Sequence, residues 1–370
     1  MISELDKETC KTMKKIAIDC RMCGKSGIGA FIDGILPHLL ATDNLFLLLG
    51  LDREQLPPTL SFSLLNKDNV SLLSCDIKPF SLKETFFFPK KLSCKINSCD
   101  AFISPYCNIP SGIKIPIFTT IHDVVFLDVK LAGKLGTFAR KLFYKHAVNK
   151  SKAIFTVSEF SKERIIKHLN CKKTIHVVHS SVPEYLQDPI SPLPEKTDSI
   201  IFIGNIKHHK GLHTLIPAFE SFREECKKSS KAIPKLLIVG EKNNFRTQDS
   251  SLSSLENSEG VEFTGFVTNE RLKLLLSQAK ILVQPSLYEG FGLPPMEALC
   301  CGTKAIVSDI PVFKEVYDKL PVTFFRTEDS EDLAKKLFQT WCDDTLLPPT
   351  KNQYSFNKTA DKMLSIIDNL

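Results

Sequence analysis

The chain of 370 residues is longer than one hydrophobic core usually supports, and its 43% apolar and 24% charged content are ordinary for a soluble globular protein, so two domains are expected. The first fifteen residues have mixed charge and no apolar core, and the longest apolar run, Leu45–Leu49, is too short to cross a bilayer, so neither a secretory signal nor a membrane span is expected. The net charge of +6 is uneven, because residues 1–185 hold 26 Lys and Arg against 17 Asp and Glu, and the remainder holds 22 against 25.

Strand and helix signals alternate along the first half, and this pattern predicts a parallel sheet flanked by helices. A loop holding Gly24, Gly27 and Gly29 follows the first predicted strand, and an amphipathic stretch over 30–40 follows the loop. Residues 134–149 have helical spacing, with five apolar side chains on one face: Leu135, Phe138, Leu142, Phe143 and Ala147. Residues 52–98 show no clear period. The strands expected in this half lie at 15–20, 101–104, 115–121, 153–157 and 175–178.

A proline-rich stretch divides the chain. Four prolines stand among polar residues over 183–196, which predicts an interdomain linker. The expected division is an N-terminal domain over 1–182, a C-terminal domain over 197–354 and a last amphipathic helix over 355–370. In the second half, strands are expected at 199–204, 235–240, 261–264, 280–283 and 304–307, and helices near Leu212, Asn269, Pro294 and Asp332.

The twelve cysteines offer little evidence for a metal or a disulfide framework. Only Cys20 and Cys23 have C-x-x-C spacing, and no second pair completes a zinc site. Cys300 and Cys301 are adjacent on a predicted helix. Free, buried thiols in a reducing cytosol are the expected state, which agrees with a cytoplasmic location.

The most informative segment is Glu289-Gly-Phe-Gly-Leu-Pro-Pro-Met-Glu297, which follows an apolar run. It reads as a tight loop and a short helix whose first turn tolerates the two prolines. The amides of Phe291, Gly292 and Leu293 would point out of the positive helix end and form a site for phosphate. Carboxylates beside a phosphate site suit hydroxyl groups, from which they accept hydrogen bonds. Phosphate together with hydroxyls indicates a nucleotide, a sugar or both.

The Glu-x7-Glu spacing in this setting resembles the signature of retaining glycosyltransferases of family 4, and the chain looks like bacterial mannosyltransferase-like group 1 enzymes. The resemblance implies an α/β GT-B fold, in which two Rossmann-like doubly wound domains face each other across a cleft. The donor would bind the second domain and the acceptor the first, and the last helix would cross back to the first domain. Weaker motifs agree with the family in order and spacing: 26–31, 120–125, 156–161, 204–211, 265–272 and 307–316.

By this resemblance, the C-terminal domain supplies the donor site. Glu297 would take the two ribose hydroxyls, Glu289 would hold hydroxyls of the transferred sugar, and Lys210 with Asn205 would bind the diphosphate beside the amides of 291–293. The family often has Arg where Asn205 stands, so one cation is lost and the phosphate clamp is weakened. A solvated loop lysine and a surface glutamate are the alternatives for Lys210 and Glu297. The apolar neighbours of Glu297 favour a mostly buried helix, in which a carboxylate needs partners.

The first domain offers two weaker candidates. His122 follows a nearly continuous apolar strand, and the resemblance puts it beside the donor sugar and the reacting bond; a structural histidine at a strand end is the alternative. Asp123 is expected to shape the turn. Ser26-Gly-Ile-Gly29 lacks the last glycine of G-x-G-x-x-G and is a weak dinucleotide signal. The resemblance makes Gly27 and Gly29 part of a loop over the donor phosphates, and a plain strand–helix turn explains them equally well.

Two further segments match the family pattern. Phe266 and Val267 follow a strand and precede a helix with Thr268 as its expected cap, so their backbone groups would suit the nucleotide base. Glu159 and Glu315 match positions for which a mainly structural role is expected.

The sequence therefore predicts a retaining transferase that moves a hexose from a nucleotide-diphosphate sugar to a hydroxyl of a glycan or a lipid-linked acceptor. GDP-mannose is the first expected donor and a UDP-sugar the next. The nucleotide sugar is a substrate, so no cofactor is expected, and no metal is expected because no Asp-x-Asp motif appears. A nucleotide-sugar epimerase of the same fold, a catalytically silent binding subunit and a dehydrogenase are the alternatives.

The basic first half suits an anionic partner, such as a phosphate-bearing acceptor or the inner face of a membrane. A generally solvated, lysine-rich surface explains the charge equally well. Nucleic acid is not expected as a partner, because the basic residues are scattered and show no interleaved aromatic side chains.

Overall fold

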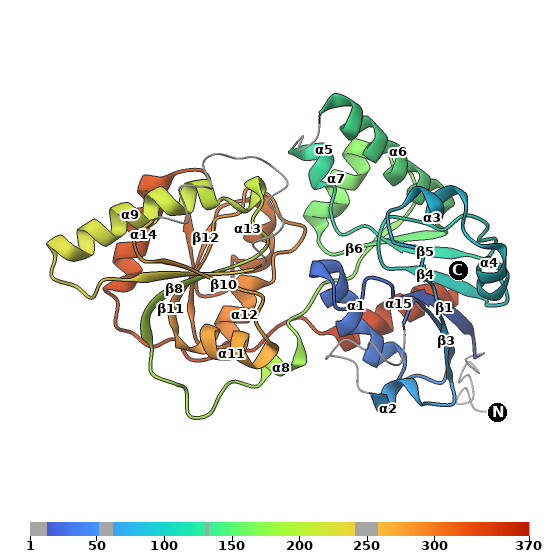
Figure 1. Cartoon of the computed structure of the whole chain (residues 1–370), viewed down its shortest axis with the longest axis horizontal. Helices are drawn as coiled ribbons and strands as arrows, with labels where there is room; N and C mark the ends of the chain where they lie inside the picture. Colours follow the sequence, from blue (N-terminus) through green and yellow to red (C-terminus); the bar gives the residue numbers. More distant parts are fainter. Residues whose placement is uncertain (1–12, 52–61, 130–132, 241–257, 370) are drawn as a thin grey trace, which may run out of the picture.

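The computed structural model describes residues 13–51, 62–129, 133–240 and 258–369, and it places them in two lobes, each built on one parallel sheet (Figure 1). The first sheet has the strand order β3-β2-β1-β4-β5-β6-β7, and the second has the order β10-β9-β8-β11-β12-β13. Neighbouring strands pair in parallel throughout both sheets. The predicted α/β class with two doubly wound sheets is confirmed.

Ten strands lie close to the apolar runs that predicted them, and three, β2, β3 and β13, were not predicted. Those of the first sheet are β1 (Lys15–Asp19), β2 (Leu45–Leu49), β3 (Val70–Leu73), β4 (Ala101–Ser104), β5 (Ile117–Thr120), β6 (Ala153–Thr156) and β7 (Ile175–Val177). Those of the second are β8 (Thr197–Ile203), β9 (Lys235–Val239), β10 (Val261–Gly265), β11 (Ala279–Gln284), β12 (Lys304–Ser308) and β13 (Val322–Phe325).

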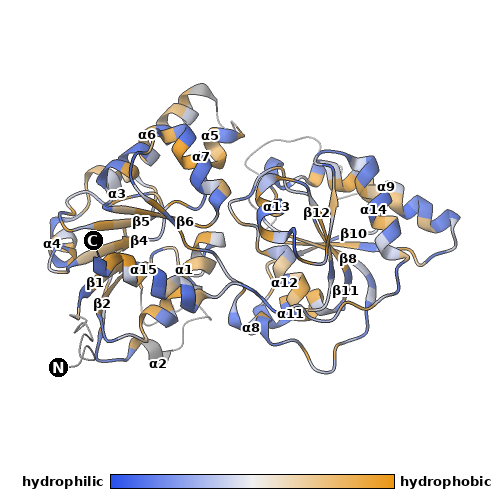
Figure 2. Cartoon of the chain, turned by 180° about the vertical axis from the view of Figure 1, so that it is seen from behind, coloured by the Kyte–Doolittle hydropathy of each residue, from blue (hydrophilic) through white to orange (hydrophobic). Residues whose placement is uncertain are grey.

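Helices cover both sheets, which is why the central strands are continuous apolar runs rather than alternating ones. Figure 2 shows hydrophobic residues concentrated in the strands and polar residues on the outer helices. In the first lobe the helices are α1 (Ser26–Leu39), α2 (Phe62–Leu65), α3 (Leu82–Phe86), α4 (Lys90–Ile96), α5 (Val125–Asp128), α6 (Lys134–Lys150), α7 (Glu159–Leu169) and, in the connection, α8 (Glu184–Gln187). The remainder are the 3-10 helix η1 (His208–Lys210), α9 (Leu212–Lys228), α11 (Asn269–Gln278), α12 (Pro294–Cys300), α13 (Pro311–Tyr317), α14 (Ser330–Trp341) and α15 (Phe356–Asn369).

The first helix begins earlier than the sequence predicted. Gly27 and Gly29 were expected in a loop, but α1 starts at Ser26 and contains both. Gly29 is required there by close packing, because a Cβ atom at this position would lie 2.4 Å from the backbone oxygen of Met22. Gly27 has no such neighbour within 4 Å. Glycine here reflects a tight approach of helix and loop, not a break in the helix.

The last helix, α15, packs against α1 of the first lobe. The ring of Phe356 stands at right angles to that of Phe31, with 6.1 Å between centroids, and a Cβ on Gly34 would collide with it. At the other end of α15, Lys14 Nζ donates to the backbone oxygen of Ile367 at 2.7 Å. The chain therefore returns to the first lobe after completing the second (Figure 1).

The two lobes also touch directly. The carboxylate of Glu315, on α13, accepts hydrogen bonds from the backbone N–H groups of Glu159 and Phe160 at the start of α7, both at 2.8 Å. A carboxylate at a helix N-terminus is favoured by the helix dipole. The rings of Phe160 and Tyr288 lie 5.5 Å apart across the same junction. Within the described ranges, no helix combines the length and the apolar content needed to cross a membrane.

Candidate active site

The candidate residues gather where the strand order of the second sheet reverses. Strand β8 lies between β9 and β11. After β8 the chain adds β9 and β10 on one side of it, and from β11 onward it adds strands on the other side. In doubly wound sheets, ligands bind at the carboxyl ends of the strands that flank this point. The loop after β8 carries Asn205 and Lys210, and the loop after β11 carries Glu289. The topology thus brings two motifs, 79 residues apart at Lys210 and Glu289, to one edge of the sheet.

Lys210 and Glu289 form an ion pair across these loops. Lys210 Nζ lies 2.7 Å from Oε1 and 2.8 Å from Oε2 of Glu289. The contact depends on Gly211, whose φ of 76° is in the left-handed region and whose Cβ, if present, would lie 1.8 Å from the backbone oxygen of Pro285. The backbone oxygen of His209 accepts from the N–H of Leu287 at 2.8 Å. The two loops are therefore fixed to each other, and Lys210 is not a free loop lysine.

A buried hydroxyl and a buried amide support Glu289. Ser286 Oγ donates to Glu289 Oε1 at 2.8 Å, and Gln284 Nε2 lies 3.4 Å from the same oxygen. Both side chains are fully buried. Neither residue was predicted as a site residue, because Gln284 ends an otherwise apolar strand and Ser286 follows it. His209, which precedes Lys210, is also buried, with 8% of its surface exposed.

The loop before α12 presents backbone N–H groups. Gly292 has a φ of 80°, and a Cβ there would lie 2.4 Å from the ring of Phe313, so only glycine fits. Tyr317 Oη donates to the backbone oxygen of Gly292, which fixes the turn. Within the described part of the chain, the N–H groups of Phe291, Gly292 and Leu293 have no acceptor. The loop is thus held rigidly while its donors remain available.

Glu297 differs from Glu289 in its surroundings. Its side chain is half-buried on α12, and its carboxylate has no hydrogen-bond or ion-pair partner among the described residues. Burial raises the pKa of Glu297 to about 7, because the charged form is poorly solvated. A carboxylate with this environment is well suited to accept hydrogen bonds from hydroxyl groups of a ligand.

His122 lies in the turn after β5 and is held in one orientation. Its Nε2 is 2.9 Å from the backbone oxygen of Pro105, so this nitrogen carries the proton and Nδ1 is an acceptor. The ring meets that of Phe31 edge-on, with 5.0 Å between centroids. Burial lowers the pKa of His122 to about 4, so the ring is neutral at physiological pH. Asp123 Oδ1 accepts from the N–H of Val125 at 3.0 Å, which confirms its expected part in shaping the turn.

Gly290 connects the two halves of the site. Its backbone oxygen accepts from Ser158 Oγ at 2.6 Å and from Ser161 Oγ at 3.2 Å. Ser161 Oγ also donates to the backbone oxygen of His122 at 2.9 Å. A Cβ on Gly290 would lie 2.7 Å from that same oxygen. The loop carrying Glu289 therefore touches the turn carrying His122, and the structure brings these two predicted site residues together.

The positions of the other predicted site residues give weaker evidence for a role in the site. Asn205 is half-buried in the loop between β8 and η1. Phe266 is 82% exposed, and Val267 packs against the main hydrophobic core. Thr268 caps α11 as expected, because its side chain accepts from the N–H of Arg271 at 3.3 Å. Gly27 faces open space in the first turn of α1.

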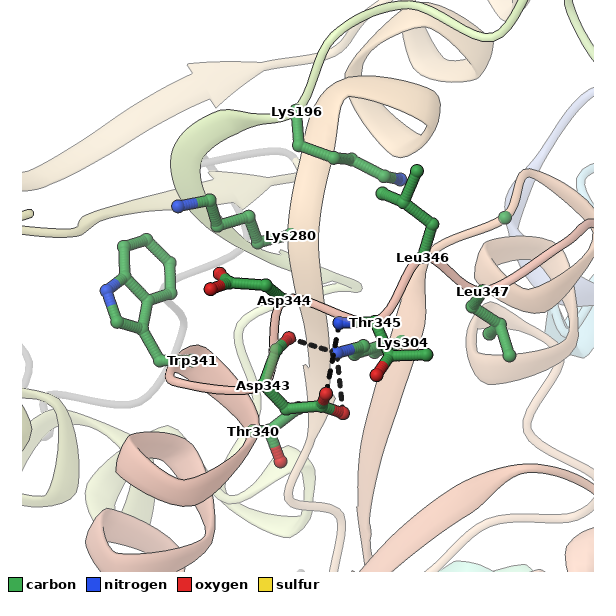
Figure 3. Close-up of a pocket in the computed structure, with 11 residues that line it drawn as sticks. Lys196, Lys280, Lys304, Thr340, Trp341, Asp343, Asp344, Thr345, Leu346 and Leu347 are labelled. Carbon is green, nitrogen blue, oxygen red and sulfur yellow. Dashed lines mark hydrogen bonds and ion pairs between the residues drawn. The ribbon is translucent and has the colours of Figure 1, made fainter.

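A cavity of about 120 Å³ lies at the opposite end of the second sheet (Figure 3). Lys196, Lys280 and Lys304 line it from the amino ends of β8, β11 and β12, and Lys304 forms an ion pair with Asp343 at 2.8 Å. Pockets for drug-sized ligands usually measure about 300 to 1,000 Å³. This cavity is too small for a nucleotide sugar and is distant from the strand ends that carry the candidate residues.

The described cysteine and acidic side chains form no disulfide and no metal site. Every cysteine described is unpaired, including the adjacent Cys300 and Cys301, which are buried on and after α12. No group of three or more His, Cys, Asp or Glu side chains is arranged as metal ligands among the residues with described positions.

Comparison with known proteins gives consistent results. Residues 185–360 match the family model "Glycosyl transferases group 1". The O-antigen chain mannosyltransferase RfbU of Salmonella typhimurium is 31% identical over 223 residues, which cover 56% of this chain and 60% of RfbU. The O-antigen chain mannosyltransferase B of Escherichia coli is 27% identical over 54% of this chain and 54% of its own length. The chain thus aligns with little more than half of each of these relatives.

Among solved structures, Anabaena Alr3699/HepE, determined in complex with UDP-glucose, superimposes with a TM-score of 0.69. The alignment covers 96% of this chain and 100% of HepE at 15% identity, so it is evidence for the fold alone. The predicted GT-B arrangement is confirmed by this likeness together with the two parallel sheets. Residues 185–360, the part of the chain that matches the group 1 glycosyl transferase model, include Lys210, Glu289 and Glu297.

Proposed function

We propose that the protein is a retaining hexosyltransferase that uses a nucleotide-diphosphate sugar, with GDP-mannose as its first donor. One observation carries the proposal: backbone N–H groups and a carboxylate that have no partner among the described residues lie with a cation at the switch point of the second sheet. A diphosphate, a sugar and a ribose need these three kinds of group. The mannosyltransferase names of two relatives support mannose as the sugar, and their O-antigen function supports a glycan acceptor.

The donor would lie along the loop and helix from Glu289 to Glu297. The N–H groups of 291–293 and the positive end of α12 would bind phosphate oxygens. Lys210 would add a full charge, and Glu297 would accept hydrogen bonds from the two ribose hydroxyls. Asn205 would contribute a neutral hydrogen bond, and the backbone near Phe266 and Val267 would meet the base. In the first lobe, the amino end of α1, with Gly27 and Gly29, would approach the phosphates from the other side.

Glu289 is better suited to positioning than to nucleophilic attack. Both its oxygens are within 2.8 Å of Lys210 Nζ, and one also accepts from Ser286. These bonds stabilise the carboxylate and reduce its tendency to attack carbon. A covalent route, as in retaining glycosidases, would need a free carboxylate at the anomeric carbon. We assign to Glu289 the holding of sugar hydroxyls.

The reaction would then proceed on one face of the sugar. The acceptor oxygen forms its bond to the anomeric carbon while the bond from that carbon to the diphosphate oxygen breaks. The proton of the acceptor hydroxyl passes to the departing diphosphate. Negative charge grows on the diphosphate, where Lys210 and the N–H groups of 291–293 are already oriented to stabilise it. His122, neutral and fixed by Pro105, would support the sugar through hydrogen bonding rather than act as a cation.

These groups stabilise the leaving diphosphate without a metal ion or a separate cofactor, and we propose that the enzyme needs neither. Turnover in the presence of EDTA, compared with turnover in added Mg²⁺, tests this part directly. Equal rates support the proposal, and loss of activity in EDTA that Mg²⁺ restores contradicts it.

The test of the function is a panel of nucleotide sugars scored first by thermal shift and then by product analysis. A ligand that binds the folded state raises its apparent stability. The proposal expects GDP-mannose to give the largest shift and to transfer mannose, with retained anomeric configuration, to an oligosaccharide acceptor. Sugar isomerisation without acceptor would indicate an epimerase, and binding without turnover a silent subunit. A shift with NAD and none with any nucleotide sugar would indicate a dehydrogenase.

A further inference from the structure

Helix α6 carries apolar side chains on two opposite faces, and the described residues of the protein cover only one of them. Tyr144, Ala147 and Val148 are buried, and Tyr144 and Val148 belong to a core cluster of the first lobe. On the other face, Leu135, Phe138 and Leu142 are 85%, 60% and 51% exposed. Their spacing of three and four residues aligns them in one stripe along the helix. The sequence pattern predicted a single apolar face here, and three of its five side chains, Leu135, Phe138 and Leu142, are more than half exposed.

A second exposed apolar group lies nearby on α3 and the residues beside it. Leu82, Phe86 and Phe87 are 67%, 62% and 76% exposed. The neighbouring ring of Phe80 packs 5.2 Å from that of Tyr106, in the loop after β4. The next residue, Cys107, packs against the core cluster that contains Tyr144 of α6. The two helices that carry these groups, α3 and α6, thus both lie near one loop at the carboxyl edge of the first sheet, and they lie close together in Figures 1 and 2.

We call the stripe Leu135, Phe138 and Leu142 with the group Leu82, Phe86 and Phe87 the apolar surface. Monomeric proteins rarely expose large hydrophobic side chains in contiguous groups unless the surface contacts something. Six such side chains, each more than half exposed, therefore indicate a partner.

The charge around the apolar surface identifies the kind of partner. The sequence of α6 contains five Lys and Arg and no Asp or Glu. Lys145 and Lys150 are exposed, whereas the guanidinium of Arg140 stacks on the ring of Phe126, 3.6 Å from its centroid. A helix with Phe and Leu on one face, basic residues around them and no acidic residues is typical of attachment to an anionic lipid surface.

A second copy of the chain fits this surface less well. A twofold interface would place the same patch of each copy against the other. The cations of one α6 would then face those of its partner, and like charges across an interface disfavour association. Anionic lipid headgroups instead complement them.

We propose that the apolar surface docks the first lobe on an anionic bilayer, with Leu135, Phe138 and Leu142 inserted at the headgroup boundary and the exposed cations of α6 against lipid phosphates. Docking of this kind needs no membrane-spanning helix, because apolar insertion and electrostatic attraction act together. It does not depend on the sugar-transfer proposal, since neither donor nor acceptor takes part.

The experiment is vesicle flotation of the full chain, with phosphatidylcholine vesicles compared with vesicles that contain phosphatidylglycerol in equal proportion. Wild-type protein is expected to float with the anionic vesicles and to be released by high salt. The triple variant Leu135→Ser/Phe138→Ser/Leu142→Ser is expected to partition at least about tenfold less. Lys145→Gln and Lys150→Gln are each expected to weaken partitioning by up to about fivefold.

The matched control is Ile233→Ser/Leu346→Ser, which removes side chains that are 48% and 77% exposed on the second lobe. It should float like wild type. Thermal unfolding of each variant shows that the fold is kept. If wild-type protein ignores anionic vesicles, or the triple variant floats as well as the control, the proposal is wrong. It is also wrong if sedimentation velocity shows a dimer that the triple variant abolishes while flotation is unchanged.

Discussion

Lys210 Nζ lies within 2.8 Å of both carboxylate oxygens of Glu289, so the cation and the first glutamate of the Glu-x7-Glu motif form one unit. The second glutamate of the motif, Glu297, has no such partner in the described structure. The two carboxylates of the motif, eight positions apart, therefore have different electrostatic surroundings. Glu289 is ion-paired with Lys210, whereas burial raises the pKa of Glu297 to about 7.

Replacing Lys210 tests the role of the pair. Lys210→Met is expected to raise the Kd for GDP-mannose by about ten- to a hundredfold, because a hydrogen bond to a charged group contributes about 1.5 to 3 kcal/mol. It also leaves Glu289 unpaired and so lowers stability. Isothermal titration calorimetry measures the Kd, and thermal unfolding measures the stability.

The double variant Lys210→Met/Glu289→Gln separates the two effects. Removing both charges should restore stability, because no buried ion is left without a partner. Donor affinity should stay low. Recovery of affinity in the double variant would show that Lys210 serves only to neutralise Glu289.

Donor binding is expected to depend on pH through the ionisation of Glu297. Its pKa of about 7 means that the carboxylate is protonated below that pH. The ionised form accepts hydrogen bonds from both ribose hydroxyls, so the Kd for GDP-mannose is expected to rise by up to about tenfold for each pH unit below 7. Calorimetry between pH 5.5 and 8.5 measures this. Glu297→Gln should bind more weakly and show a flat profile; an unchanged slope in this variant would assign the titration to another group.

The folding stability is also expected to depend on pH through the carboxyl group of Glu297. The folded pKa of about 7 lies above the ordinary value of 4.5, so the folded state holds a proton that the unfolded state has lost within this window. Stability should therefore fall as pH rises from about 4.5 to 7, through this residue. Subtracting the unfolding free energies of Glu297→Gln from those of wild type gives the contribution of Glu297 ionisation to stability at each pH. A difference that grows in the opposite direction would contradict the raised pKa.

Gly211 and Gly27 give a matched pair of backbone tests. Gly211→Ala forces a Cβ onto the oxygen of Pro285 at a φ of 76°, and a loss of more than about 2 kcal/mol is expected. Gly27→Ala places a Cβ in open space within a helix, where alanine is favoured over glycine by about 0.5 to 1 kcal/mol. Denaturant unfolding measures both. Equal stabilities of the two variants would contradict the fixed geometry of the Lys210 loop.

Glu315 tests the contact between the lobes. Glu315→Gln keeps the shape of the side chain but removes the charge that faces the amino end of α7. A stability loss of about 0.5 to 1 kcal/mol is expected, because carboxylates near helix N-termini contribute on this scale. High salt should weaken the wild-type contact and narrow the difference. A difference that persists unchanged in high salt would show that the charge plays no part.

More of the fold than of the candidate site could be predicted from the sequence. Apolar runs such as 153–157 and the prolines at the start of α12 determine local structure, so ten strands and the start of α12 were predicted to within a few residues. Strands β2, β3 and β13 were not predicted. Gly29 was misread because its requirement comes from Met22 packing against it, a tertiary contact. Periodicity marked α6 as a helix but gave no information about which side the first lobe would cover.

The site contacts depend on distant segments. The pairing of Lys210 with Glu289 joins loops that only the sheet order brings together. The support from Ser286 could not be read from the sequence, because a serine after an apolar strand has many ordinary roles. The orientation of His122 depends on the oxygen of Pro105, and a single ring atom leaves no trace in the sequence pattern.

The most direct test of the proposed function is the structure of the protein in complex with GDP-mannose. We expect the ribose hydroxyls to lie within hydrogen-bond distance of the Glu297 carboxylate, and the diphosphate to contact Lys210 and the N–H groups of 291–293. A nucleotide bound away from α12, with Glu297 and Lys210 unchanged, would contradict the proposed function.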